Sequence, residues 1–320
     1  MKNQPLNRLL ESSQGRATLE YLTETLSSTD LQSLLLEVFR RRAARVDAKT
    51  LMRQFRENRF VHPSHVAPAT MRSLDHLAYR LLPEDFEAVE LSPLTPLGTC
   101  SAMAAVDQDW SVTTSRHNEV TSDPNNVMAL LAAERRREHW RQDRRSVERV
   151  KLATSHRAVR PQLVDIPAAW SHFRLFALVI SGRGEPDRRF ETESLVEQID
   201  YYIRVMRECE TIGMPLSRIH ARVTPLDEID IPRLEREVVE ILAERHPDAK
   251  VEFDHERTTG RKYYRYACFQ VNAEDSSGTD LFLADGGFTD WTEKLLSDTR
   301  ERMAISGLGT ERLAYCAKKS

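Results

Sequence analysis

The chain has 320 residues, of which 40% are hydrophobic and 30% are charged, a composition typical of a folded protein and not of a disordered or fibrous one. The net charge of -3 excludes a general attraction to nucleic acid, so RNA binding would need a local basic patch. The four cysteines form no CxxC pair, and no apolar run approaches the ~20 residues that span a bilayer. We therefore expect a cytoplasmic, water-soluble protein without a zinc or redox pair and without a membrane partner.

The first part of the chain is predicted to be helical. Leu31, Leu35 and Val38 recur at helical spacing, and the Ser-Thr-Asp sequence at residues 28–30 offers helix N-caps just before them. The sequence predicts a helical N-terminal region over residues 1–82. We interpret this region as an appendage for packing or dimerisation.

The residue pattern changes from helical to strand-like near residue 83. Phe86–Leu91 alternates apolar and polar residues, as a half-buried strand does, and Pro93 ends this run. Asp123 and Pro124 then begin a helix, because a proline in the first turn loses no intrahelical hydrogen bond.

A charged run follows within this helix. Residues 134–151 carry eight Lys or Arg and four Asp or Glu, which predicts a solvated helix face. The alternative is a contact with an RNA backbone through Arg135 to Arg149, which would need basic side chains on one face.

The second half alternates strands and helices. An apolar strand is predicted over Phe173–Ile180 and an amphipathic helix over Phe190–Cys209. Short turns join three further strands: Val251–His255, Tyr263–Val271 and Asp280–Ala284. Short turns imply antiparallel pairing, since parallel strands need a long crossover. The sequence therefore predicts an α+β domain over residues 83–320, an antiparallel sheet flanked by helices.

The common nucleotide-binding motifs of parallel-sheet folds are absent. The sequence contains no GxxxxGK[ST] and no GxGxxG between a strand and a helix. It also contains no GxSxG and no HExxH. A nucleotide site would therefore belong to another fold class.

Three short elements near the end of the chain carry a family resemblance. They comprise Gly260, Arg261, Tyr263 and Tyr264, then Gly286 and Gly287, and finally Gly307, Gly309 and Arg312. Their order resembles the class II aminoacyl-tRNA synthetase core, nearest to histidyl-tRNA synthetase and the ATP phosphoribosyltransferase regulatory subunit. The resemblance covers residues 83–316 and implies a class II catalytic core in this part of the chain.

The last element resembles motif 3 of that class and implies an ATP site. Gly307 and Gly309 have no Cβ, so the turn between strand and helix can lie close under an adenine ring. The guanidinium of Arg312 can stack on the base and reach a phosphate. The resemblance implies a catalytic and ATP-binding role for Arg312.

Motif 2 is matched only in part. Arg174 lies where the family grips the α-phosphate, which implies a catalytic and ATP-binding role, but Phe176 replaces the family's glutamate. Arg183 belongs to a basic loop that either binds phosphate or is a solvated turn. The resemblance implies Mg²⁺ with the ATP, and its ligands stay unknown, with Glu191 and Glu193 as candidates.

The remaining elements imply a pocket for an amino acid or another carboxylic acid. Arg116 and Glu119 precede the helix at Asp123 and are candidates for a carboxylate and an amine, or else form a polar turn. The other substrate-binding candidates are Arg261, Tyr263, Tyr264, Gly286 and Gly287. The family's arginine after the glycine pair is replaced by Phe288, so specificity for histidine is not implied.

Two functions follow from the resemblance. One is an ATP-dependent enzyme that activates an amino acid or other carboxylic acid as an adenylate for an acceptor other than ordinary tRNA. The alternative is a non-catalytic regulator that senses an amino acid or a protein partner. Motif 1 of the class, matched here by the strand before Pro93, implies a homodimer. Since only eight residues follow Arg312, we expect no anticodon-binding domain.

Overall fold

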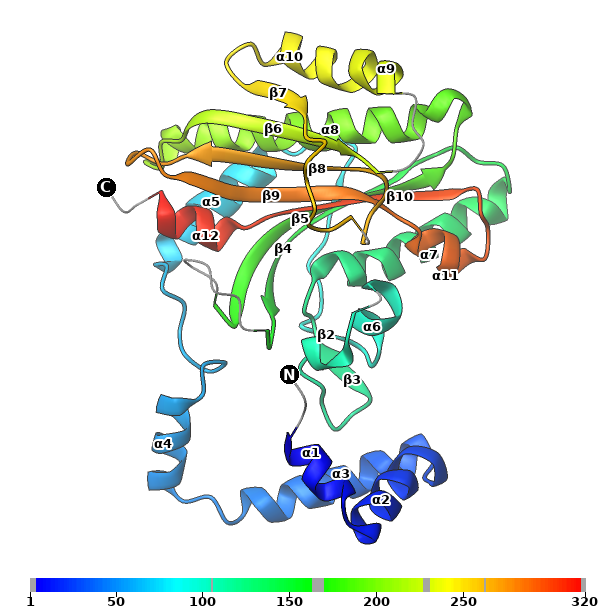
Figure 1. The fold of residues 1–320 in the computed structure, drawn as a ribbon, viewed down its shortest axis with the longest axis vertical. Helices are drawn as coiled ribbons and strands as arrows, with labels where there is room; N and C mark the ends of the chain where they lie inside the picture. Colours follow the sequence, from blue (N-terminus) through cyan, green and yellow to red (C-terminus); the bar gives the residue numbers. More distant parts are fainter. Residues whose placement is uncertain (1–3, 105, 163–169, 227–230, 262, 318–320) are drawn as a thin grey trace.

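A computed structural model describes residues 4–104, 106–162, 170–226, 231–261 and 263–317 (Figure 1). The α-helices are α1 (Gln4–Leu10), α2 (Ser13–Glu20), α3 (Ser28–Ala43), α4 (Ala48–Glu57), α5 (Pro68–Arg80), α6 (Thr99–Ala104), α7 (Pro124–Gln142), α8 (Arg189–Glu208), α9 (Ile231–Leu234), α10 (Ile241–Arg245), α11 (Trp291–Leu296) and α12 (Thr310–Cys316). The strands are β1 (Glu87–Ala88), β2 (Leu94–Pro96), β3 (Asn118–Val120), β4 (Val150–Val159), β5 (His172–Arg183), β6 (Ser217–Pro225), β7 (Lys250–Phe253), β8 (Arg265–Glu274), β9 (Asp280–Thr289) and β10 (Glu301–Leu308).

Eight of these strands form one sheet, in the order β1-β4-β5-β10-β9-β8-β6-β7. The five central pairs, from β4·β5 to β8·β6, are antiparallel. Only the edge pairs β1·β4 and β6·β7 are parallel. The prediction of an α+β fold with an antiparallel sheet flanked by helices is confirmed.

The sheet is covered on both faces because its strands alternate apolar side chains between them. On β5, Phe176, Leu178 and Ile180 belong to a core shared with α5, α8 and α12. Ala177 and Val179 belong to a second core shared with α7 and α11. Figure 1 shows α8 along one face of the sheet and α7 with α11 on the other.

The N-terminal helices differ from the rest of the chain. Helices α1 to α4 bury no residue, and Figure 1 shows them apart from the sheet. Helix α5 falls within the span 1–82 of the predicted helical region, yet it buries Leu74 and Leu77 against the core. Residues 58–66, which join α4 to α5, therefore connect exposed helices to the packed body.

Two general expectations can be compared with the structure. All four cysteines are buried and form no disulfide. Among the described residues, no helix is both long and apolar enough to cross a membrane.

Candidate functional site

A large cavity opens on the face of the sheet that carries α7. Its volume is about 1110 Å³. The floor comes from β5, β9 and β10, and the walls from α6, the start of α7, residues 258–261 and residues 263–264. Arg160, Gln162 and Trp170, at the two ends of the β4–β5 loop, border it on another side. This volume is sufficient for a nucleotide beside a small acid, since ligand cavities typically measure about 300–1,000 Å³.

The turn from β10 to α12 supplies an open floor and a cation. A Cβ added at Gly307 would meet one atom within 4 Å, the Nδ2 of Asn125 at 4.0 Å, so this glycine faces open space in the cavity. Arg312 lines the cavity one turn further on, and its buried Nε finds no hydrogen-bond partner among the described residues. A guanidinium left in this state is suited to bind an anion or stack on a ring.

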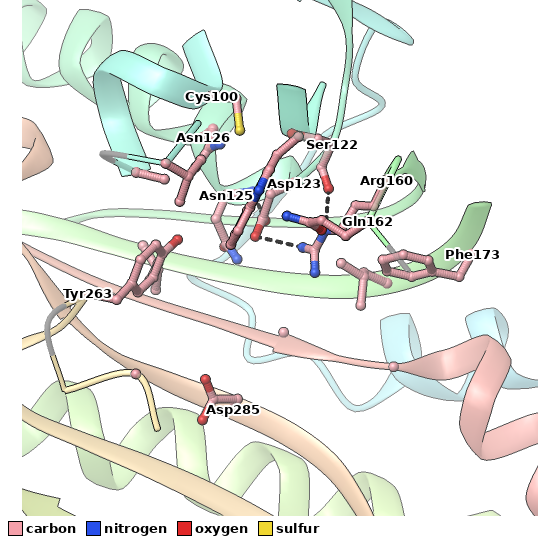
Figure 2. Close-up of a pocket in the computed structure, with 18 of the residues that line it drawn as sticks. Cys100, Ser122, Asp123, Asn125, Asn126, Arg160, Gln162, Phe173, Tyr263 and Asp285 are labelled. Atoms are coloured by element: carbon pink, nitrogen blue, oxygen red, sulfur yellow. Dashed lines mark hydrogen bonds and ion pairs between the residues drawn. The ribbon is translucent and has the colours of Figure 1, made fainter. Parts of the chain in front are cut away.

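The beginning of α7 brings a carboxylate and a second guanidinium into the cavity. Asp123 caps the helix by accepting from the backbone N–H of Asn125 (3.0 Å), as a short polar side chain at this position does. Its other oxygen pairs with Arg160 at 3.0 Å, and Arg160 also donates to the carbonyl of Ser122. Arg160 lies over the ring of Phe173, 5.1 Å from its centroid. Figure 2 shows these side chains grouped on one side of the cavity.

A second carboxylate, Asp285, rises from β9 on the opposite side (Figure 2). It accepts from Arg257 Nη2 and from the Tyr264 hydroxyl, each at 2.7 Å. Burial raises the pKa of Asp285, while Arg257 and Tyr264 oppose the shift. Since 31% of the Asp285 side chain remains accessible, it can still reach a ligand.

Two buried asparagines at the start of α7 also line the cavity. Asn125 and Asn126 are buried, and their side-chain oxygens accept no hydrogen bond within the described part of the chain. Tyr263 lines the same space, and burial together with the nearby charge of Asp123 raises the pKa of its hydroxyl. A buried amide oxygen without a hydrogen bond costs free energy, so a polar ligand that donates to these oxygens would gain binding free energy.

Gly286 and Gly287 act by packing below the cavity. A Cβ at Gly286 would lie 2.5 Å from the Phe269 ring and from Ser306, on the face away from the cavity. A Cβ at Gly287 would lie 2.7 Å from Tyr264, whose ring covers this glycine. Gly287 therefore lets Tyr264 approach the sheet and reach Asp285.

Arg174 borders the cavity, but its guanidinium points to the other face. It pairs with Asp75 of α5 at 2.8 Å. The reason is strand periodicity, since Phe173 and Leu175 face the cavity and the residue between them must face α5. Phe176 is for the same reason a core residue, packed on Tyr79 and Tyr201.

Three other predicted site residues lie outside the cavity lining. Arg116 is exposed in the turn directly before β3. Glu119 is buried and accepts from the backbone N–H groups of Gly98 and Cys100, so it holds a loop and not a ligand. Arg183 ends β5 opposite Glu301, at the end of the strand away from Phe173.

The candidate metal ligands also lie elsewhere. Glu191 pairs with Arg302 and Arg188, and Glu193 pairs with Arg189, all around the start of α8 on the far face of the sheet. No group of three His, Cys, Asp or Glu within the described ranges could hold a metal ion. Any Mg²⁺ would depend on ligand phosphates, as Mg²⁺ sites in nucleotide-binding proteins usually do.

Several arginines of the basic run around α7 are engaged in ion pairs. Arg136 is completely buried and pairs with Glu301, also completely buried, at 2.9 Å. Arg135 pairs with Glu87, Arg137 with Glu134. These pairings account for much of the positive charge that the RNA-binding alternative needs.

Asp123, Arg160 and Arg257 are site residues that the sequence did not predict. Arg257 lies three residues before Gly260, just outside the recognised element. Arg160 and Asp123 are 37 positions apart in the chain, so no local spacing could have paired them. The one usable signal was Arg160-Pro161, where a proline after a basic residue marks the end of a strand.

Comparison with known proteins supports the fold. No protein-family model and no curated protein matches the sequence. An ATP phosphoribosyltransferase regulatory subunit/histidyl-tRNA synthetase from Bacillus halodurans superposes with a TM-score of 0.59 at 11% identity, over 81% of this chain and 83% of that one. S. aureus histidyl-tRNA synthetase gives a TM-score of 0.56 at 13% identity, over 80% and 68%. A threonyl-tRNA synthetase structure from Cryptosporidium parvum gives 0.56 at 8%, over 78% and 63%.

These neighbours define the class of the fold. The chain has a class II synthetase-like fold, and its structural neighbours include histidyl-tRNA synthetase, threonyl-tRNA synthetase and the ATP phosphoribosyltransferase regulatory subunit. Identities of this size establish the fold alone, and both catalytic and regulatory proteins share it.

Proposed function

We propose that this chain binds ATP and a small carboxylic acid, such as an amino acid, in the cavity and joins them as an acyl adenylate. The observation that carries the proposal is the guanidinium of Arg312, whose Nε has no hydrogen-bond partner among the described residues, beside the open floor at Gly307. Together they provide a stacking cation and a surface without side chains, which suit a flat base and its phosphates.

The acid would lie between Asp123 and Asp285. An ammonium group on it would replace water around these carboxylates and satisfy the buried oxygens of Asn125 and Asn126. Burial and the negative charge of Asp123 raise the pKa of the Tyr263 hydroxyl, so this part of the cavity favours a cation. An amino acid is therefore the preferred acid.

The chemical step follows from this arrangement. A carboxylate oxygen of the acid attacks the α-phosphorus, the new O–P bond forms, and the bond to pyrophosphate breaks with its electron pair. Arg312 would stabilise negative charge on the phosphates, and Arg160 and Arg261 also line the cavity. Mg²⁺ would supply further charge neutralisation on the phosphates. The protein's main contribution would be positioning.

Pyrophosphate exchange tests this proposal. The wild-type protein would be incubated with ATP, Mg²⁺, labelled pyrophosphate and each of the twenty amino acids in turn, followed by a panel of other carboxylic acids. Label appearing in ATP with one acid supports adenylation and identifies the substrate class. Exchange that stays at background for every acid, in protein that binds ATP, would contradict it.

A second candidate is a binding protein that uses the same cavity without chemistry. The observation that favours it is the ion pair between Arg174 and Asp75, which turns the expected α-phosphate ligand toward α5. In that case the ligand would change assembly or partner affinity. ATP or amino-acid binding without exchange would favour this candidate.

We also propose that the chain forms a homodimer, as the class II resemblance implies. Strand β1 lies at an edge of the sheet, beside a groove lined by Tyr79, Phe86 and Val89. An edge strand exposes backbone groups that a second copy can pair with.

A further inference from the structure

Residues 58–66, which we call the strap, join α4 to α5 and cross the two ends of the β4–β5 loop. Arg59 donates to the hydroxyl of Ser171 (2.5 Å) and to the carbonyl of Pro161. Pro161 and Ser171 lie at opposite ends of that loop, so one guanidinium holds both. Each is the direct neighbour of a cavity residue, Arg160 or Trp170.

The strap also reaches α12, the helix that carries Arg312. Ser64 donates to Oε1 of Glu311, the residue before Arg312. His65 stacks on Trp170 with ring centroids 5.0 Å apart, and Trp170 contacts the Tyr315 ring edge-on at 5.0 Å. The strap therefore touches both the β4–β5 loop and the helix at the other side of the cavity.

These contacts close into a ring of polar groups. The carbonyl of His62 can only accept, so Nε2 of His172 carries the proton that it donates there (2.6 Å). Nδ1 of His172 is then an acceptor, and it receives Arg157 Nη1 at 2.8 Å. Arg157 pairs with Oε2 of Glu311 at 2.9 Å, and Glu311 returns to the strap through Ser64.

Glu311 connects this ring of polar groups to the elements that line the cavity. Besides Arg157 and Ser64, its carboxylate accepts the backbone N–H of Arg174 at 2.9 Å, which ties α12 to β5. Glu311 is fully buried, so each of these donors offsets the cost of burying its charge. Losing strap donors would leave α12, and with it Arg312, less well held.

We propose that the strap positions the ligand-binding arginines of the cavity, and that Arg59 is its principal positioning residue. No strap residue lines the cavity, so the effect acts through Pro161, Ser171 and Glu311. The affinity part of this inference rests on the proposed ATP site. The proposal also assigns residues 58–66, which precede the core, a role in the site on the sheet.

The test compares Arg59→Ala and Arg59→Lys with wild type, using Arg218→Ala as the control. Arg218 is exposed on β6 and pairs with Glu274. Amide hydrogen exchange would be followed for residues 170–176, 309–317 and, as an internal reference, 265–274 of β8. Calorimetry with MgATP and thermal unfolding would be measured on the same samples.

We expect Arg59→Ala to exchange faster at 170–176 and 309–317 and not at β8, with an unfolding temperature lowered by only a few degrees. MgATP affinity should fall by up to about tenfold, because Arg59 acts on the ligand-binding arginines and touches no ligand itself. Arg59→Lys, with a single donor group, should recover part of both effects. Arg218→Ala should match wild type.

Two results would overturn the inference. The first is that both segments of Arg59→Ala exchange at the wild-type rate. The second is that Arg59→Ala exchanges faster throughout, β8 included, which would indicate a general loss of stability. If the wild type binds no MgATP, the proposed function fails, and the exchange pattern still decides whether the strap holds the cavity. Ser64→Ala provides a second variant, expected to affect 309–317 more than 170–176.

Discussion

Substituting Gly307 by alanine separates ligand binding from stability. The added methyl would meet only Asn125 Nδ2, at 4.0 Å, and Gly307 has no positive φ that a side chain would strain. Alanine also reduces the freedom of the unfolded chain, so the free energy of unfolding should stay the same or rise by up to about 1 kcal/mol. A ligand packed on the floor of the cavity would instead meet the methyl group directly.

The loss of affinity can be bounded from the cost of overpacking. Forcing one extra methyl group into a well-packed contact costs about 1–3 kcal/mol. This corresponds to a loss of roughly 5- to 150-fold in MgATP affinity. Calorimetric titration with MgATP and urea unfolding, both on Gly307→Ala and wild type, would measure the two quantities.

Gly286→Ala on the neighbouring strand is the matched substitution. Its methyl would lie 2.5 Å from Phe269 and Ser306, so we expect a loss of about 1–3 kcal/mol in stability. Gly307→Ala should thus lose MgATP affinity and keep its stability, whereas Gly286→Ala should lose stability. If Gly307→Ala binds MgATP as tightly as wild type, the nucleotide does not lie over Gly307, and this part of the reasoning is refuted.

Two further predictions concern the core. Arg136→Met should lower the free energy of unfolding in urea by about 3–5 kcal/mol, because it leaves the completely buried Glu301 without its partner. Adding Glu301→Leu should recover most of this loss, and a single-variant loss below about 1 kcal/mol would contradict it. Burial raises the pKa of Cys209 to about 12 and of Cys268 to about 11. These thiols should therefore resist Ellman's reagent at pH 8 until urea unfolds the protein, and rapid labelling of the native state would refute their burial.

The pairing of β8 with β9 could be predicted from sequence because a short turn around Gly278 joins the strands predicted over Tyr263–Val271 and Asp280–Ala284. The same reasoning was wrong for the strand predicted over Val251–His255, which is β7 and pairs in parallel with β6. Strand β4 was missed because its buried positions include Thr154, Ser155 and His156, which hide the apolar pattern. Tertiary packing satisfies such polar residues in ways that spacing along the chain does not reveal.

The candidate site was harder to predict than the fold. Gly307, Gly309 and Arg312 are close in sequence, so a local motif was sufficient to bring them to one cavity. Arg174 shows the limit of this approach, because a difference of one residue along a strand moves a side chain to the other face. Asp123 and Arg160 meet only after α7 and β4 have packed.

The central claim is that the cavity binds a nucleotide through Arg312. Calorimetric titration with MgATP on wild type, Arg312→Ala and the exposed control Arg116→Ala tests it most directly. Losing a guanidinium that contacts phosphate or a base should cost about 1.5–3 kcal/mol, a drop in affinity of at least about tenfold. We expect this drop for Arg312→Ala and unchanged binding for Arg116→Ala. Absence of MgATP binding by wild type, or equal affinity in all three proteins, would contradict it.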